Sequence, residues 1–206
     1  FNPAFYNADS VSAQQEKINQ NPHFVYLAYF APEVIKVGIS QEERGIRRLL
    51  EQGARLALKL ETFSSALIAR QYEAKISALD GIVETMPIHK KLELIKQPFE
   101  RAAGEEKLRQ KLLEIEQKIG VSFPKSELIA CEDYFHTNDI DLTRAIIMKG
   151  QNQLVGRVRS VIGSIVITEH KDQLLAYNLK KFIGYQAHKI TGDIELELPS
   201  EQLTLF

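Results

Sequence analysis

The chain has 206 residues, with 26 Lys and Arg against 27 Asp and Glu, and 44% of its residues are hydrophobic. These values are typical of a globular protein, and the length allows one large domain or two small ones. The longest apolar run, residues 24–31, is far shorter than the about 20 residues that a membrane-spanning helix needs, which excludes an integral membrane protein. The single cysteine, Cys131, predicts a reducing, cytoplasmic location and a small buried side chain.

Residues 1–22 are polar and show no sustained period, which predicts a lead-in segment. The first residue is Phe rather than Met, so we expect that the chain was processed or truncated. Aromatic and β-branched residues then predict strands at 24–30 and 34–39. The turn at Ala31-Pro-Glu-Val34 joins the two strands into a hairpin.

Helices and one further strand follow the hairpin. Ser40 and Glu43 fit a capping box, which predicts a helix from Ser40 to the stop at Gln52-Gly53. Residues 56–63 alternate as a third strand does, and Ser65 is the expected cap of a helix that runs to Leu79. Pro87 and Pro98 interrupt the chain before a charged helix at 99–119.

From Gln151 the character changes to short β-rich stretches, at 154–158, 162–168, 174–179 and 182–190. Strands at this spacing predict a small β-barrel or sheet. The expected fold class is α+β. The expected units are a lead-in (1–22), a first domain (23–97), a helical connector (98–150), a small barrel-like β-rich domain (151–192) and an acidic tail (193–206).

The segment from His23 to Leu79 resembles the GIY-YIG nuclease superfamily in its order of strand, turn, strand, helix, strand and helix. Val25-Tyr26-Leu27 stands where that family has Gly-Ile-Tyr, and Lys36-Val37-Gly38 stands where it has Tyr-Ile-Gly. The motif Arg48-Leu-Leu-Glu-Gln-Gly-Ala54 is similar to an uncharacterised branch with an Arg-x-x-x-Gln-Gly-Ala helix end. The resemblance implies a β-hairpin/α/β/α domain whose site contains Tyr26, Lys36, Arg48 and Glu73.

The chain departs from the family pattern in three ways. Lys36 replaces the second tyrosine, Tyr26 lies in Val-Tyr-Leu, and Arg48 follows Gly38 at a slightly greater distance than usual. That branch also implies a cysteine-rich segment upstream, which this sequence does not contain. These departures leave the expected fold intact and make a non-catalytic scaffold an alternative.

The chemistry of phosphodiester cleavage assigns a role to each of these residues. Arg48, with Arg44 four residues earlier, can hold a backbone phosphate, and Glu73 can hold Mg²⁺ or Mn²⁺ among the small residues around it. Tyr26 can act as a general base or as an orienting hydroxyl. Lys36 is its candidate activating cation only if a register slip or bulge places both on one face of the hairpin. The alternatives are a core tyrosine and a solvated glutamate beside close helix packing.

The chain ends in a pentad that resembles the bacterial sliding-clamp-binding peptide Gln-Leu-Ser/Asp-Leu-Phe. The pentad is Gln202-Leu203-Thr204-Leu205-Phe206. An extended peptide of this kind can place Leu205 and Phe206 in an apolar pocket while Gln202 hydrogen-bonds at the rim. The alternative is that Leu203, Leu205 and Phe206 form an edge strand of their own domain.

The near-neutral net charge of −1 conceals segregated charge. Residues 142–192 hold eight basic and two acidic residues, and residues 44–59 hold five basic and one acidic. DNA is therefore a permitted partner, with Arg44, Arg47, Arg48, Arg157 and Arg159 as candidate contacts. The expected function is a metal-dependent DNA endonuclease, or a nuclease-derived DNA-processing protein, recruited by the clamp. The alternatives are a non-catalytic nucleic-acid-binding module and a protein-interaction adaptor.

Overall fold

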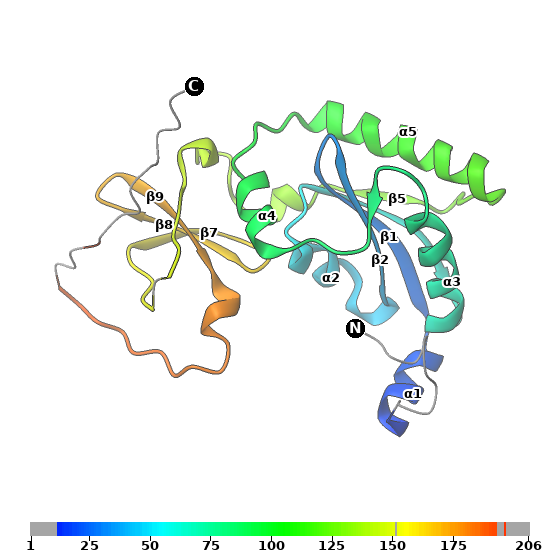
Figure 1. Ribbon diagram of the computed structural model, residues 1–206, viewed down its shortest axis with the longest axis horizontal. Helices are drawn as coiled ribbons and strands as arrows, with labels where there is room; N and C mark the ends of the chain where they lie inside the picture. The colour runs from blue at the N-terminus through cyan, green and yellow to red at the C-terminus, as the bar shows by residue number, and fades with distance from the viewer. Residues whose placement is uncertain (1–11, 151, 193–195, 197–206) are drawn as a thin grey trace.

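The computed structural model describes residues 12–150, 152–192 and 196, which form a mixed α+β fold with two sheets (Figure 1). The first sheet has the order β4-β2-β1-β3-β5, with β1 antiparallel to both β2 and β3. Its strands are β1 (His23–Ala31), β2 (Val34–Gln41), β3 (Leu56–Phe63), β4 (Ile82–Val83) and β5 (Glu127–Ile129). The predicted hairpin and third strand are therefore confirmed, and every residue of the central strand β1 is buried.

In the described residues, five α-helices accompany the sheets: α1 (Ala13–Gln20), α2 (Gly45–Gln52), α3 (Ala66–Ser77), α4 (Ile88–Leu94) and α5 (Arg101–Ile119). The predicted cap of α3 is confirmed, because the Ser65 hydroxyl accepts a hydrogen bond from the Ile68 amide. Gly53 ends α2 with a φ of 70°, as its position in the sequence predicted. None of the helices in the described residues combines the length and apolar character that a membrane crossing requires.

The predicted helix start at Ser40 is wrong. Strand β2 continues to Gln41, which pairs with His23, so Ser40 is a buried strand residue and caps nothing. A 3-10 turn, η3 (Glu42–Arg44), follows, and α2 begins only at Gly45. Pairing with the long central strand outweighs the local capping signal. Helices α1 and α4 were not predicted: Ser12 caps α1, and α4 begins directly after Pro87.

The second sheet has the order β6-β9-β8-β7. Its strands are β6 (Ile146–Ile147), β7 (Arg157–Ile162), β8 (Ile165–His170) and β9 (Gln173–Asn178). Gly163 lies in the turn between β7 and β8, which moves both strands from their predicted bounds. The predicted strand at 182–190 is wrong, because the Asn178 side chain accepts from the Lys180 amide and starts the 3-10 turn η6 (Leu179–Phe182). Strand β6 pairs with the outer side of β9, where a strand at 182–190 was expected. In the described residues the sheet is open rather than barrel-like.

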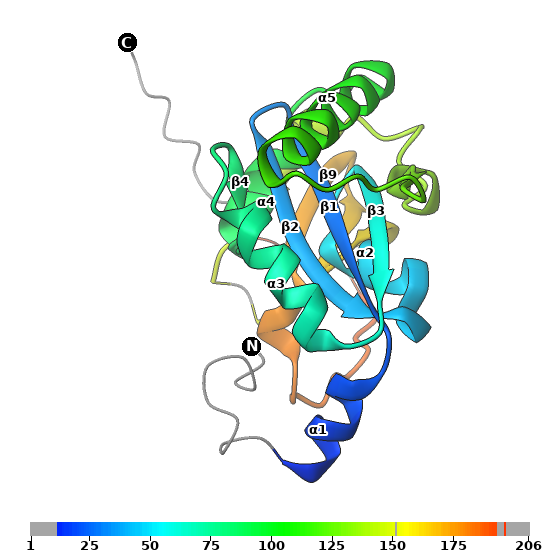
Figure 2. The same ribbon diagram turned by 90° about the vertical axis from the view of Figure 1, so that its right-hand side faces the viewer.

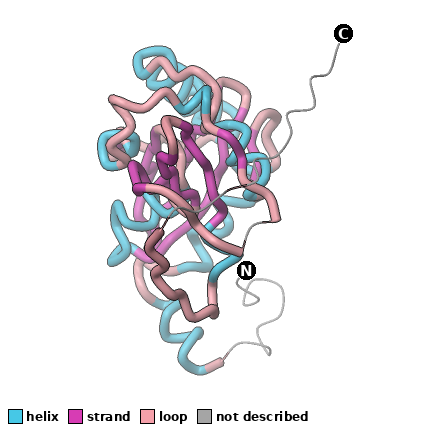
Figure 3. The backbone as a smooth tube through the Cα atoms, turned by 90° about the vertical axis from the view of Figure 1, so that its left-hand side faces the viewer, coloured by secondary structure: helices cyan, strands magenta, loops and turns pink. Residues whose placement is uncertain are grey.

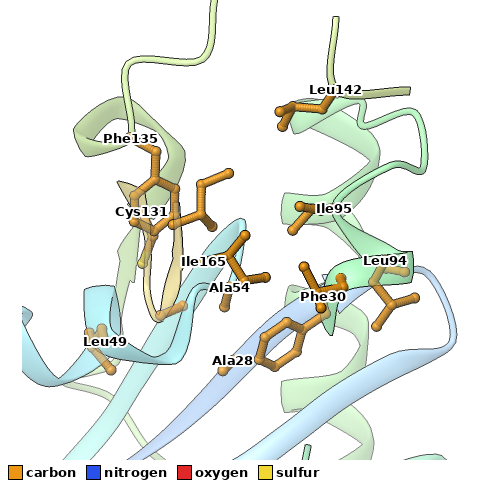
Figure 4. Packing of buried hydrophobic residues seen from close by; sticks show 14 of the residues in the cluster. Ala28, Phe30, Leu49, Ala54, Leu94, Ile95, Cys131, Phe135, Leu142 and Ile165 are labelled. Atoms are coloured by element: carbon orange, nitrogen blue, oxygen red, sulfur yellow. The ribbon is translucent and has the colours of Figure 1, made fainter. Parts of the chain in front are cut away.

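Hydrophobic packing joins the two sheets. Helices α3 and α5 cover one face of the first sheet (Figure 2). Side chains of β1 alternate, so that Val25 and Leu27 pack with residues of α3 and α5, whereas Ala28 and Phe30 pack in the opposite layer. That opposite layer contains α2, α4 and the second sheet, and Figure 4 shows Ile165 of β8 close to Ala54. Cys131 is fully buried in the same cluster, as predicted. Viewed from the side of the second sheet, the strands of both sheets lie one behind the other (Figure 3).

Two glycines, Gly53 and Gly163, bring the layers into close contact. A Cβ on Gly163, which has a φ of 60°, would lie 2.8 Å from the Gly53 amide nitrogen and 2.9 Å from the Glu51 carbonyl oxygen. We expect Gly163→Ala to lower the free energy of unfolding by about 2–4 kcal/mol, because backbone strain adds to overpacking. Gly120→Ala is the matched control, since Gly120 has a φ of 68° with nothing near its Cβ. Equal losses in urea denaturation of the two variants would contradict this contact.

Candidate functional site

The β1–β2 register decides whether Lys36 can reach Tyr26. Tyr29 pairs with Ile35, whereas Ala31 pairs with Val34, so one extra residue is accommodated on β1 at Phe30. Lys36 therefore pairs with Ala28 and projects from the same face as Tyr26. Of the two registers left open by the sequence, the structure adopts the one that brings the ammonium to the tyrosine.

The Tyr26 ring lies across Gly38, its direct partner on β2. A Cβ at position 38 would be 2.6 Å from the Tyr26 Oη and 3.1 Å from the Lys36 Nζ. The Lys36 Nζ is 5.8 Å from the centre of the Tyr26 ring and donates a hydrogen bond to the Val37 carbonyl at 2.8 Å. The absence of a side chain at Gly38 is what lets the ring and the ammonium share this space.

Arg48 approaches Tyr26 from α2. Its guanidinium lies within electrostatic reach of the hydroxyl, and it forms an ion pair with Glu51 at 3.7 Å. The Tyr26 Oη and the Arg48 Nε are both buried without a hydrogen-bond partner among the described residues. Two polar groups thus face each other with unused hydrogen-bonding capacity, which is costly unless a further group joins them.

Glu73 completes the group from α3. Its carboxylate is 3.4 Å from the Arg70 guanidinium, and its side chain is only 16% exposed. It lies within electrostatic reach of Lys36 and Tyr26, and it approaches the backbone of Ile39 in β2. The structure therefore brings Tyr26, Lys36, Arg48 and Glu73 together from β1, β2, α2 and α3.

Burial dominates the electrostatics of the group. It raises the pKa of Tyr26, an effect that Arg48 opposes and Glu73 reinforces. It also raises the pKa of Glu73 against the opposing charges of Arg70 and Lys36, and it lowers the pKa of Lys36. Tyr26 is accordingly a neutral hydroxyl at physiological pH, because its ordinary pKa is already about 10.

The other predicted contact residues are more dispersed. Arg44 lies in η3 rather than on α2, but like Arg48 it pairs with Glu51. Arg47 and Arg157 are exposed, whereas Arg159 is paired with Glu169 and Asp139. The pentad residues Gln202, Leu203, Leu205 and Phe206 lie outside the described residues.

The donor set near Glu73 limits which metal could bind. No group of three or more His, Cys, Asp or Glu side chains in the described part of the chain is arranged to hold a metal ion. A hydrated Mg²⁺ or Mn²⁺ needs only one or two carboxylates, with waters and substrate phosphates as its other ligands. Glu73, with the unpartnered Tyr26 hydroxyl nearby, fits such an ion and does not fit a dehydrated cage.

Two surface hollows, of about 410 Å³ and 220 Å³, lie elsewhere. The larger is lined by residues of α2, β3 and β5, including Ile46, Lys59 and Leu128, and the smaller surrounds Arg55. Neither contains the four converging side chains. The larger hollow is lined by one cation and two carboxylates, Lys59 with Glu127 and Asp133, so it offers no excess of positive charge to an anion.

Sequence reasoning missed three charged neighbours of the site. Arg70 lies one turn before Glu73 on α3, and that spacing could have revealed it. Lys91 comes from α4, which was not predicted, and Lys180 comes from η6, between two expected strands. No local pattern links these two lysines to the hairpin.

A comparison with protein families finds one match, to the proteins of unknown function grouped as DUF2797, over residues 7–187. The match covers both sheets, including the α4 and η6 segments that supply Lys91 and Lys180. No curated protein and no solved structure matches the chain.

Proposed function

The chain belongs to the DUF2797 family, whose function is unknown, and we propose that it is a metal-dependent DNA endonuclease on a GIY-YIG-like scaffold. The observation that carries the proposal is the bulged hairpin register, which places Lys36 on the face of Tyr26, where Arg48 and Glu73 also approach. The order β1, β2, α2, β3, α3 is also the order that the resemblance implies. Together these features support a phosphodiesterase site at Tyr26.

Arg48 is the residue suited to stabilise phosphoryl charge. Its planar guanidinium can donate two parallel hydrogen bonds to phosphate oxygens, and its Nε has no partner in the described residues. Preorganised donors of this kind contribute most of the rate acceleration in many enzymes, because charge develops on the phosphoryl oxygens in the transition state. The Glu51 carboxylate holds the side chain in place from one side.

Tyr26 is better suited to orient the attacking water than to remove its proton. Burial raises the pKa of the hydroxyl, so the group stays protonated at neutral pH. A neutral hydroxyl can accept a hydrogen bond from water and donate one to a phosphate oxygen. Of the two roles that the sequence left open, the proposal therefore takes the orienting one.

Glu73 is the residue that would hold the divalent ion. When bound, Mg²⁺ or Mn²⁺ supplies charge stabilisation at the phosphoryl group and lowers the pKa of a bound water. The Lys36 ammonium stands where the resemblance implies a tyrosine, and it can donate to a phosphate oxygen beside Arg48. The same substitution is the observation that favours a non-catalytic DNA-binding module as the second candidate.

Cleavage assays separate the candidates. The purified chain is incubated with labelled branched, nicked and plain duplex DNA, in Mg²⁺, Mn²⁺ or EDTA. The proposal expects metal-dependent strand cleavage of at least one DNA. Salt-sensitive binding without cleavage of any DNA favours the module, and negligible affinity that does not change with salt favours a protein adaptor.

Recruitment by the bacterial sliding clamp is the second part of the proposal, and only the sequence Gln202–Phe206 supports it. We expect a labelled peptide of residues 197–206 to bind purified clamp in a fluorescence-anisotropy titration. Leu205→Ala with Phe206→Ala should weaken binding at least about tenfold, because those side chains anchor the peptide in an apolar pocket. Pro199→Ala is the control. Equal binding of the double variant, or no binding of the parent peptide, would contradict recruitment.

A further inference from the structure

Four cationic side chains from four separate elements form a group around Lys91, and two of them, Lys36 and Arg48, also lie beside Tyr26. We call them the cation cluster: Lys36 of β2, Arg48 of α2, Lys91 of α4 and Lys180 of η6. The Lys91 ammonium lies within electrostatic reach of the other three. Lys91 and Lys180 come from parts of the chain beyond the segment that resembles the nuclease family, so the resemblance implies no role for them.

Backbone and aromatic groups hold the half-buried ammonium of Lys91. Its Nζ donates a hydrogen bond to the Gln52 carbonyl at 2.5 Å and lies 5.2 Å from the centre of the Phe30 ring. Lys36 is held in the same way, by the Val37 carbonyl and the Tyr26 ring. These contacts fix the positions of both ammonium groups without neutralising their charge.

The cluster holds more cations than carboxylates. Glu51 pairs with Arg48, and Glu73 and Glu84 lie within electrostatic reach of Lys36. Among the described residues, neither Lys36, Lys91 nor Lys180 forms an ion pair within 4.0 Å, and Arg48 has only the longer pair with Glu51. The Arg48 Nε and the Tyr26 hydroxyl are both buried without a hydrogen-bond partner in the described residues. Bringing several like charges together with fewer counter-ions costs free energy, and an anion with several acceptor oxygens would recover it.

We propose that the cation cluster binds a phosphate group of the DNA backbone, with Lys91 as a contact that gains its proton when the phosphate binds. The inference rests on the proposed function for the identity of the ligand, but it does not require cleavage. A tetrahedral phosphate matches a cluster of donors from several directions. The site would position the strand next to Tyr26.

The surroundings of Lys91 support a link between phosphate binding and proton uptake. Burial first, and then Lys180, Lys36 and Arg48, lower the pKa of Lys91 to about 8. Strands β1 and β9 pack against α4. Strand β1 contributes His23, Tyr26 and Tyr29 as ionisable side chains, and β9 contributes only Tyr177. The other ionisable groups of α4 itself are His89, Lys90 and Glu93, all exposed. A bound phosphate would reverse the local charge and raise the pKa of Lys91. Binding would therefore take up protons near pH 8 and weaken as the pH rises above it.

Calorimetric titration in EDTA measures this uptake directly. A short DNA duplex is titrated into the full chain at pH 8, in two buffers with different ionisation enthalpies, and inorganic phosphate is titrated in parallel. We expect uptake of about half a proton per site, and about a tenfold loss of affinity between pH 7 and pH 9. In Lys91→Arg, which stays charged, both effects should disappear. In Lys90→Arg, the exposed neighbour, both should remain.

The possible results of this titration distinguish the phosphate subsite from the proposed nuclease function. Proton uptake on DNA binding would mean that the subsite holds a phosphate of the DNA strand. Proton uptake with inorganic phosphate alone would mean that the same subsite holds a free phosphate. No uptake with either ligand, or identical pH dependence in Lys91→Arg and the wild type, would overturn the proposal. A chain that takes up protons but never cuts DNA contradicts only the nuclease function, and a chain that cuts DNA without uptake contradicts only this subsite.

Discussion

Glu73→Gln is expected to slow single-turnover DNA cleavage by at least about 1,000-fold, because it removes the one carboxylate in the group that can hold a divalent ion. The substitution keeps the size and hydrogen-bonding shape of the side chain. DNA affinity in EDTA should stay within about threefold of the wild type, since phosphate contacts depend on the nearby cations. Quenched-flow cleavage and anisotropy titrations measure the two quantities separately.

Glu106→Gln is the matched control, because Glu106 is exposed on α5, and it should cleave at the wild-type rate. A rate for Glu73→Gln within about tenfold of the wild type would remove Glu73 from the proposed site. Parallel losses of cleavage and DNA affinity would place it in strand binding instead.

Gly38→Ala is expected to have the second large effect. The new Cβ would overlap the Tyr26 Oη and Cζ, at 2.6 Å and 2.7 Å, so the buried ring must move. We expect the free energy of unfolding to fall by about 1–3 kcal/mol. Cleavage should fall at least about 100-fold, because a displacement of this size misaligns the reacting groups. Urea denaturation and single-turnover assays measure the two losses.

A second substitution distinguishes steric overlap from general damage. Replacing Tyr26 with Leu in the Gly38→Ala background removes the overlapping ring, so most of the lost stability should return while cleavage should not. If the double variant is as unstable as the two single losses combined, the contact between the ring and Gly38 is not the cause.

Local signals predicted three of the five strands of the first sheet, and β4 and β5 were not predicted. Aromatic and β-branched residues identified β1 and β2, alternation identified β3, and the cap at Ser65 and the stop at Gly53 are both found in the structure. The signal at Ser40 failed because β2 gains more from pairing with β1 than a helix gains from a cap. Competition between local propensity and long-range pairing cannot be judged from a local pattern.

The site was predictable only in part, for a related reason. The resemblance supplied Tyr26, Lys36, Arg48 and Glu73, but the bulge at Phe30 decides whether Lys36 faces Tyr26, and a turn sequence alone does not specify a bulge. Lys91 comes within electrostatic reach of Lys36, Arg48 and Lys180 through the packing of α4 and the second sheet on β1. Such long-range contacts produce no characteristic residue spacing that could be recognised in the sequence.

The central claim is that side chains from separate elements act as one site on one phosphodiester. The most direct measurement is a comparison of single-turnover cleavage rates of Arg48→Met, Glu73→Gln and the double variant. Residues that act as a unit are strongly non-additive. The double variant should therefore cleave within about threefold of the slower single variant. Fully multiplied losses would mean that Arg48 and Glu73 act independently, and wild-type rates in either single variant would contradict the site.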